Sequence, residues 1–348
     1  MIAMSGGVDS SVAALLALDF SDEAAGCTLK LFESDVAGLE NGCCSQESAE
    51  DARSVAYGLG MKFYVFSEQE TFREKVLLPF ARDYEQGRTP NPCIECNRNL
   101  KFGLLYDKAR TLGYDCLVTG HYARIVREGD QWLLKKALDE TKDQSYVLYM
   151  LSQEQLAHIR FPLGELRKTQ VRQIAAEHGF GNAEKADSQD LCFAPDGDYA
   201  AAAARCTGRI SQPGQFLDLE GNVLGQHRGI VHYTVGQRRG LGQSFGERAY
   251  VVRIDPERNA VIIGPKEALF STEATVREFH WISGSAPEGK LRCAVKTRYR
   301  QAEQPCTVEA MEGSRARILF DSPQRAVTPG QAAVLYDGDT VLGGGILE

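Results

Sequence analysis

Short apolar runs alternate with segments of helical periodicity over the first 120 residues of the chain. The runs 25–32 and 115–119 are apolar enough for buried strands, whereas 8–20 repeats its apolar residues at the spacing of a helix face. Strands that alternate with helices form parallel sheets whose right-handed crossovers cover both faces, so this part is predicted to be α/β. Further strands are expected over 2–4 and 62–66, and further helices over 48–59, 72–84, 100–112, 143–151, 153–159 and 169–178.

The pattern changes near residue 207. From there on, glycine and proline separate short β-like runs, such as 250–255 and 260–264 on either side of the turn 256–259. Regularly spaced short strands with turn signals indicate a barrel or a sandwich rather than β-α-β units. We therefore expect one α/β domain and two small, mostly β domains. Their expected ranges are 1–206, 207–270 and 271–348.

Composition restricts the class of protein. The chain has 348 residues and no apolar run near the ~20 residues that a membrane-spanning helix needs. The first apolar stretch of the chain, 12–18, is not preceded by the basic residues that come before the apolar region of a signal peptide. Ten cysteines without a secretory signal point to a reducing compartment, where thiols are more often catalytic or metal-binding than paired. A cytoplasmic protein with no membrane partner is expected.

Charge is distributed unevenly. The net charge of −8 at first argues against a nucleic-acid partner. Residues 19–51, however, hold nine acidic residues and only Lys30 as a base, so the rest of the chain is neutral on balance. Residues 290–300 (KLRCAVKTRYR) carry five bases and no acid, a stripe that can neutralise phosphates because salt screens remote acids. A solvated strand face is the alternative interpretation of this stripe.

The segment 5–11, SGGVDSS, lies between the first predicted strand and the first predicted helix. Its glycines allow a tight turn, and the N-terminus of the helix presents unpaired N–H groups to an anion. Asp9 can hold a Mg²⁺ that bridges phosphates, and no lysine is present, so this is not a Walker-type loop. The segment resembles the pyrophosphatase-type (PP) loop of enzymes that cleave ATP between its α and β phosphates. A capped helix after a glycine turn is the alternative. Because the strand before it is short, we expect the natural chain to start upstream of Met1.

Two thiol-bearing segments stand out. Cys93 and Cys96 form a Cys-x-x-Cys pair in a proline-rich loop, before a helix expected to begin near Asn97. A thiol at a helix N-terminus has a lowered pKa and is more nucleophilic, which favours Cys96 as an attacking group. Cys192 is a second candidate. The alternatives are a zinc ligand for Cys96 and a small buried apolar residue for Cys192, and the role of Cys43 and Cys44 stays open.

Taken together, these segments closely resemble the bacterial tRNA-specific 2-thiouridylase family over nearly the whole chain. The resemblance implies a PP-loop domain that binds ATP and catalyses the reaction (1–206), a small tRNA-binding domain (207–270) and a C-terminal β-barrel (271–348). The markers are AMSGGVDSS (3–11), GRTPNPC (87–93), CN (96–97), TGHY (119–122), KDQSYVLY (142–149), FPLGEL (161–166), CF (192–193), HYTVGQRRGLG (232–242) and TRYRQ (297–301).

The resemblance implies that ATP, with Mg²⁺, adenylates O2 of the wobble uridine of tRNA and that sulfur then replaces this oxygen. Cys192 would carry a persulfide delivered by a sulfur-donor protein. Cys96 would be the nucleophile that releases the sulfur, which leaves a Cys96–Cys192 disulfide. The ATP-binding residues would be Ala3, Met4, Ser5, Gly6, Gly7, Val8, Asp9, Ser10, Leu29 and Gly120. The tRNA-binding residues would be Asn91, Pro92, Cys93, His121, Lys142, Asp143, Gln144, Arg298, Tyr299 and Gln331.

Position 93 departs from the family pattern, because some members have aspartate where this chain has cysteine. Related tRNA thiolases hold a [4Fe–4S] cluster on three cysteines, so Cys93, Cys96 and Cys192 are an alternative cluster-binding set. Two other functions share parts of the pattern. A different PP-loop ATP-dependent ligase would need neither thiol, and a zinc-stabilised RNA-binding module would not turn over ATP. His121, finally, is either a ligand-facing residue at a strand end or part of the core.

Overall fold

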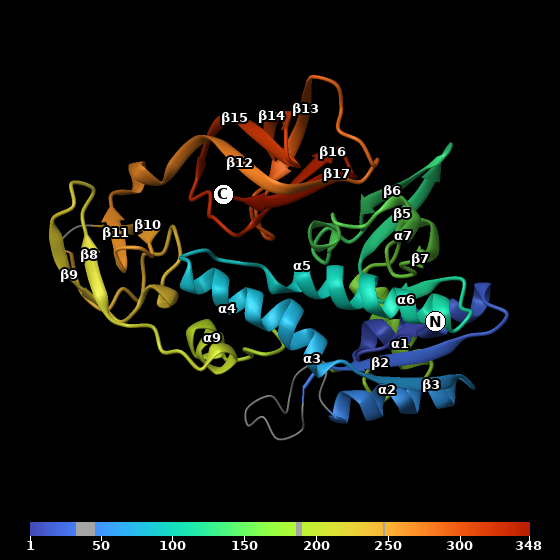
Figure 1. The fold of residues 1–348 in the computed structure, drawn as a ribbon. Helices are drawn as coiled ribbons and strands as arrows, with labels where there is room; N and C mark the ends of the chain where they lie inside the picture. The colour runs from blue at the N-terminus through green and yellow to red at the C-terminus, as the bar shows by residue number, and fades with distance from the viewer. Residues whose placement is uncertain (33–45, 186–189, 246–247) are drawn as a thin grey trace.

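The computed structural model describes residues 1–32, 46–185, 190–245 and 248–348 (Figure 1). Cys43 and Cys44 lie outside the described residues. The chain forms an α/β unit, a small β unit and a C-terminal barrel, in that order along the sequence. In Figure 1 the red barrel lies over the helices of the first unit, and the yellow and orange strands of the middle unit lie at one end.

The first unit is built on a parallel sheet in the order β3-β2-β1-β4-β7. Successive residues of β1 point to opposite faces. Ile2 and Met4 pack with α1 and α2 on one face, whereas Met1 and Ala3 pack with the residues of α6 on the other. Both faces are therefore covered, as the alternating pattern predicted. The strands are β1 (Ile2–Ala3), β2 (Ala25–Lys30), β3 (Lys62–Ser67), β4 (Leu117–Thr119) and β7 (Ile159–Arg160).

Two long helical stretches of this unit contain π-helical segments. The first is α3 (Gln69–Phe72), a π segment (Arg73–Leu77) and α4 (Leu78–Glu85). The second is α5 (Pro92–Cys96), a π segment (Asn97–Leu104) and α6 (Leu105–Thr111). The other α-helices of the described residues are α1 (Val8–Ala17), α2 (Gln46–Gly58), α7 (Gln153–His158), α8 (Lys168–Glu177) and α9 (Tyr199–Thr207).

The structure differs from the sequence prediction at several points, two of which lie between residues 123 and 151. The helix expected over 143–151 is reduced to a 3-10 turn at Ser145–Val147, because the Asp143 carboxylate accepts the backbone N–H groups of Ala137 and Ser145. The hairpin of β5 (Ala123–Glu128) and β6 (Gln131–Lys136) was not predicted. It pairs with the last strand of the barrel at Lys135–Thr340 and so joins the first domain to the third.

The middle unit is a small sheet in the order β10-β11-β8-β9, with Phe216, Val251 and Val261 in its core. The last unit is a closed antiparallel barrel in which β12 pairs with both β15 and β17. The predicted fold class, an α/β domain followed by two mostly β domains of which the last is a barrel, is thus confirmed. The strands are β8 (Gly214–Leu217), β9 (Val223–His227), β10 (Tyr250–Asp255), β11 (Ala260–Gly264), β12 (Phe270–Trp281), β13 (Lys290–Lys296), β14 (Gln304–Met311), β15 (Arg315–Arg325), β16 (Ala332–Asp337) and β17 (Thr340–Leu347).

Hydrogen bonds fix the junctions between the units. Thr89, which precedes α5, donates its N–H to the carbonyl of Pro329 (2.8 Å) and accepts a bond from the Gln331 amide (2.7 Å). Arg298, after β13, donates to the carbonyls of Val235 (3.2 Å) and Ala326 (2.8 Å). In the described parts of the chain, none of the helices has the length and apolar character required to cross a membrane.

Phe193 anchors the segment that follows residue 190. Its ring lies 5.0 Å from that of Phe80 and 6.2 Å from that of Phe72, edge to face in both cases. Phe193→Ala should destabilise the first domain by about 3–4 kcal/mol and lower the melting temperature of the helical signal by roughly 10 °C. Circular dichroism at 222 nm measures this directly, because the last α-helix of the described chain ends at Thr207. Phe270→Ala, at a 45% exposed ring, is the matched control, and equal shifts for the two variants would contradict the packing described.

Candidate active site

The loop between β1 and α1 is tightly wrapped around the N-terminus of α1. Gly6 has φ +73°, and a Cβ there would lie 2.1 Å from the carbonyl oxygen of Ser48, so only glycine fits. The Ser10 hydroxyl accepts the N–H of Ser5 (3.1 Å) and donates to the carbonyl of Gly7 (2.9 Å). Gly120, at the end of β4, approaches the loop so closely that a Cβ would lie 2.9 Å from the carbonyl carbon of Asp9. The predicted residues 3–10 and Gly120 therefore do meet, at the carboxyl edge of the sheet.

Asp9 is held by two side chains from distant segments. Both of its oxygens accept hydrogen bonds from the Lys168 ammonium, at 2.6 and 2.8 Å, and one also accepts the Tyr122 hydroxyl at 2.8 Å. Lys168 begins α8 and is 8% exposed. Lys168 was not predicted as a site residue, because it lies 159 residues from Asp9 in the sequence and only the fold brings the two together.

Asn182 is a second residue that the sequence analysis overlooked. Its side-chain NH₂ donates to the carbonyl of Gly6 (3.0 Å) and to the hydroxyl of Ser11 (2.9 Å). Its carboxamide oxygen is buried and has no hydrogen-bond partner. Asn182 thus supports the loop from behind, and nothing in the local sequence marks it as a loop contact.

His121 is buried beside the loop. Its ring lies 5.5 Å from that of Phe102 and 5.7 Å from that of Phe161, and Nδ1 lies 2.6 Å from the Thr119 hydroxyl oxygen. Burial, with a smaller contribution from the Lys101 charge, holds the pKa of His121 well below its ordinary value. The imidazole is therefore neutral at physiological pH.

The helix that carries the first thiols begins earlier than the sequence predicted. It starts at Pro92 rather than near Asn97, because Asn91 caps it by accepting the N–H of Cys93 (3.2 Å). Cys93, which is exposed, therefore occupies the first turn, whereas Cys96 is half-buried and one turn further on. Cys93, and not Cys96 as predicted, therefore lies at the N-terminus of the helix.

Cys192 and Cys96 pack against one hydrophobic cluster, which contains Phe72, Phe80 and Phe193. Tyr199 lies between the two thiol segments. Its hydroxyl donates to Asp190 (2.7 Å), and burial, that bond and the charges of Asp190 and Cys93 raise the pKa of Tyr199 to about 12. Leu29, at the end of β2, packs against this cluster too. Cys96 and Cys192 thus border the same cluster, although they are far apart in sequence.

Most of the predicted tRNA-binding residues make bonds within the protein. The backbone N–H of Gln144 donates to the carbonyl of Tyr122 (2.9 Å), and the backbone N–H of Tyr122 donates to the side-chain oxygen of Gln144 (3.0 Å). The Tyr299 hydroxyl donates to the carbonyl of Asp143 (3.2 Å). Burial raises the pKa of Tyr299 above its usual value, and the charges of Asp143 and Cys93 raise it further. Segments 88–93, 142–144, 297–301 and 328–331 therefore converge near Cys93.

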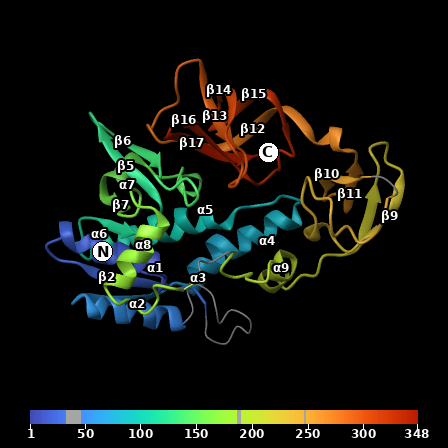
Figure 2. The same cartoon turned by 180° about the vertical axis from the view of Figure 1, so that it is seen from behind.

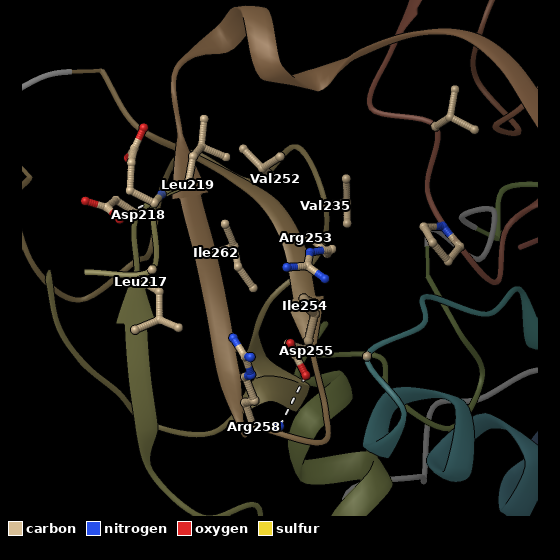
Figure 3. A pocket seen from close by; sticks show the side chains of 15 residues that line it. Leu217, Asp218, Leu219, Val235, Val252, Arg253, Ile254, Asp255, Arg258 and Ile262 are labelled. Atoms are coloured by element: carbon tan, nitrogen blue, oxygen red, sulfur yellow. Dashed lines mark hydrogen bonds between the residues drawn. The ribbon is translucent and has the colours of Figure 1, made fainter. Parts of the chain in front are cut away.

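Two hollows lie away from the loop. One cavity of about 420 Å³ lies on the middle domain and is lined by residues that include Leu219, Val252 and Arg258 (Figure 3). Another, of about 670 Å³, is lined by residues that include Phe66, Lys75 and Arg98. Neither is lined by residues 3–11. Within the described residues, no group of three or more His, Cys, Asp or Glu side chains is arranged to hold a metal ion, so Cys93, Cys96 and Cys192 do not form a ready cluster site.

Comparison with known proteins identifies the family. The chain is 46% identical over 353 residues to the tRNA-specific 2-thiouridylase MnmA of Acetivibrio thermocellus, covering 100% of this chain and 98% of the relative. The chain belongs to the tRNA-specific 2-thiouridylase family. Identity to the 2-thiouridylase of Clostridioides difficile is 45% (100% and 97% coverage), and to that of Chloroflexus aggregans 48% (99% and 97%). The resemblance found in the sequence is confirmed.

Three domain models match consecutive parts of the chain. A "tRNA methyl transferase HUP domain" matches residues 1–196, a "tRNA methyl transferase PRC-barrel domain" 207–265 and an "aminomethyltransferase beta-barrel domain" 271–347. Among solved structures, the NMN synthetase of Francisella tularensis matches 60% of this chain and 77% of its own (TM-score 0.33, 19% identity). The U34-tRNA thiolase NcsA of Methanococcus maripaludis, solved with its [4Fe–4S] cluster, matches 58% of this chain and 62% of its own (TM-score 0.35, 15% identity).

The buried neutral His121 has a consequence for stability. Because its folded-state pKa lies below the unfolded value of about 6.5, the unfolded chain binds the proton first, and stability falls as the pH drops below about 6.5. His121→Gln should make the free energy of unfolding less pH-dependent below 6.5, by up to about 1.4 kcal/mol per pH unit. Urea unfolding of both proteins at pH 7.0, 6.0 and 5.5 measures this difference. Parallel pH profiles would contradict the burial of a neutral imidazole.

Proposed function

We propose that this chain is a tRNA uridine 2-sulfurtransferase, which uses ATP to replace O2 of the wobble uridine by sulfur. The observation that carries the proposal is the 45–48% identity to named 2-thiouridylases over essentially the whole chain. The substrates are then tRNA and ATP, with Mg²⁺ bound to the nucleotide. We place the reaction in the cytoplasm, where thiols stay reduced between turnovers.

In the first step, the loop and the N-terminus of α1 bind the phosphates of ATP, with Asp9 toward the Mg²⁺. Residues 3–10 and Gly120 form this site, and Leu29 contributes an apolar contact to the adenine. O2 of the uridine attacks the α-phosphorus, the α–β bond breaks, and pyrophosphate leaves while N3 loses its proton. The oxygen of the base now belongs to an AMP group, which is a good leaving group. The protein contributes positioning and charge stabilisation.

In the second step, the Cys96 thiolate attacks Cys192 Sγ of a Cys192 persulfide that a sulfur-donor protein has supplied. The S–S bond of the persulfide breaks and a Cys96–Cys192 disulfide forms, so the outer sulfur leaves with two electrons as sulfide. Sulfide adds to C2 of the uridine and displaces AMP. External thiols reduce the disulfide. The packing of Cys96 and Cys192 against one cluster supports this pairing.

The helical stretch that carries Cys96 also runs from the thiols toward the loop proposed to bind ATP. Phe102 lies six residues further along this helical stretch, and its ring lies 5.5 Å from that of His121 at an angle of 45°, next to Gly120 and the loop. The base would lie in this interval, against Asn91, Pro92, Cys93 and His121. Lys142, Asp143, Gln144, Arg298, Tyr299 and Gln331 would hold the surrounding RNA, since bases that undergo chemistry are commonly splayed out of the strand.

Cys96→Ser and Cys192→Ser should each abolish thiolation while pyrophosphate release that depends on tRNA continues. Cys206→Ser is the matched control, because Cys206 packs against the same cluster and has no role in the proposed reaction. The assay combines wild type or variant with ATP, unmodified tRNA and a persulfide donor, and follows 2-thiouridine and pyrophosphate separately. Thiolation by both active-site variants would refute the relay. Normal ATP use without need for tRNA would favour another PP-loop ligase, and bound zinc without ATP use a zinc-stabilised RNA-binding module.

The persulfide route predicts that iron-free protein is active. After anaerobic purification, iron and acid-labile sulfide should be absent while thiolation with the persulfide donor proceeds, because the described residues hold no ready three-ligand group. Cys93→Asp should retain activity for the same reason. About four iron and four sulfide per chain, with loss of activity in Cys93→Asp, would instead establish the alternative [4Fe–4S] site on Cys93, Cys96 and Cys192.

A further inference from the structure

The phosphate loop contains no cation of its own. Residues 3–11 include no lysine or arginine, and Asp9 adds a negative charge at the position where a polyphosphate would bind. A carboxylate alone would repel that ligand. The structure places the Lys168 ammonium against both oxygens of Asp9, at 2.6 and 2.8 Å, so the ion pair has no net charge.

Lys168 is held in position from several sides. Its backbone N–H donates to the Asp139 carboxylate (2.9 Å), and its ammonium lies 5.9 Å from the centre of the Tyr122 ring. Its helix α8 lies alongside α1, with Val171 packed in the same cluster as Val12 (Figure 2). The end of the side chain is therefore fixed at the loop while the stem is buried.

We propose that Lys168 is the phosphate-binding cation of this loop, released from Asp9 when Mg²⁺·ATP binds. The Asp9 carboxylate turns to the Mg²⁺, and the ammonium exchanges Asp9 for the oxygens of the polyphosphate. This inference rests on the proposed use of ATP and adds to it the residue that neutralises the phosphates. No covalent bond forms or breaks in the exchange.

The physical reason for the exchange is burial. An ammonium that is 8% exposed is stabilised by anionic partners in every state of the site, because desolvation of a charge is costly. Mg²⁺ competes for Asp9 at the same moment that the phosphates supply new acceptors. Before the nucleotide arrives, the charges of Asp9 and Lys168 offset each other. Afterwards, the carboxylate binds the metal and the ammonium binds the phosphates.

The test is the affinity of the full-length protein for ATP with Mg²⁺, measured by isothermal titration calorimetry. Lys168→Met should weaken binding roughly 10- to 100-fold, since it removes a charge-assisted bond while it keeps the length of the stem. Lys168→Arg should recover part of the affinity. Lys62→Met is the matched control, because Lys62 pairs with Glu23 (3.0 Å) in the same domain, and it should bind ATP like the wild type.

A probe on the wild-type protein covers the case in which Lys168→Met does not fold. An adenosine polyphosphate that ends in pyridoxal forms an imine with a lysine near the phosphates, which borohydride then reduces to a stable amine. Mass spectrometry should find the label on Lys168, and ATP should protect against it. Labelling of another lysine, with Lys168 unmodified, would overturn the proposal.

The two proposals fail in different ways. ATP affinity within about twofold of wild type in a folded Lys168→Met protein would make Lys168 a structural partner of Asp9 only, whatever the fate of thiolation. Weakened ATP binding in that variant, together with no thiouridine formed by the wild type, would uphold the role of Lys168 and refute the proposed sulfur transfer.

Discussion

The structure depends on where the first strand lies in its sheet. β1 pairs in parallel with β2 on one side and with β4 on the other. The sheet therefore grows from β1 in one direction through β2 and in the other direction through β4, and the strand order reverses at this point. At such a position the loops at the carboxyl ends of the strands separate and leave room for a ligand. The loop 5–11 and the end of β4 lie at this point, which is why Gly120 approaches the backbone of Asp9.

Much of this arrangement follows from local sequence. Apolar runs, helical periodicity and a glycine loop between them are enough to predict the α/β domain and the tight turn before α1, because each depends on neighbouring residues. Contacts between distant segments could not be predicted. Lys168 and Asn182 reach the loop from beyond residue 160, and β6 pairs with the barrel strand β17 at Lys135 and Thr340. The β5–β6 hairpin itself has a local signal, the two-residue turn at Gly129-Asp130, which was missed.

The thiols illustrate the same limit. The Cys-x-x-Cys spacing identified the segment. Asn91 and Pro92, however, start the helix at Pro92, so Cys93 and not Cys96 lies in its first turn. From its local sequence, Cys192 was equally consistent with a small buried apolar residue. Its neighbour Phe193 packs its ring against Phe72 and Phe80, more than 100 positions earlier in the chain, and Cys96 packs against the same cluster.

The account requires that the oxygen replaced by sulfur leaves on AMP, since the phosphate loop and the thiols would otherwise have no common substrate. A single turnover with tRNA that carries ¹⁸O at O2 of the wobble uridine tests this directly. Mass spectrometry of the products should find one ¹⁸O in the phosphate of AMP. Label in water or in pyrophosphate, with unlabelled AMP, would contradict adenylation of the base.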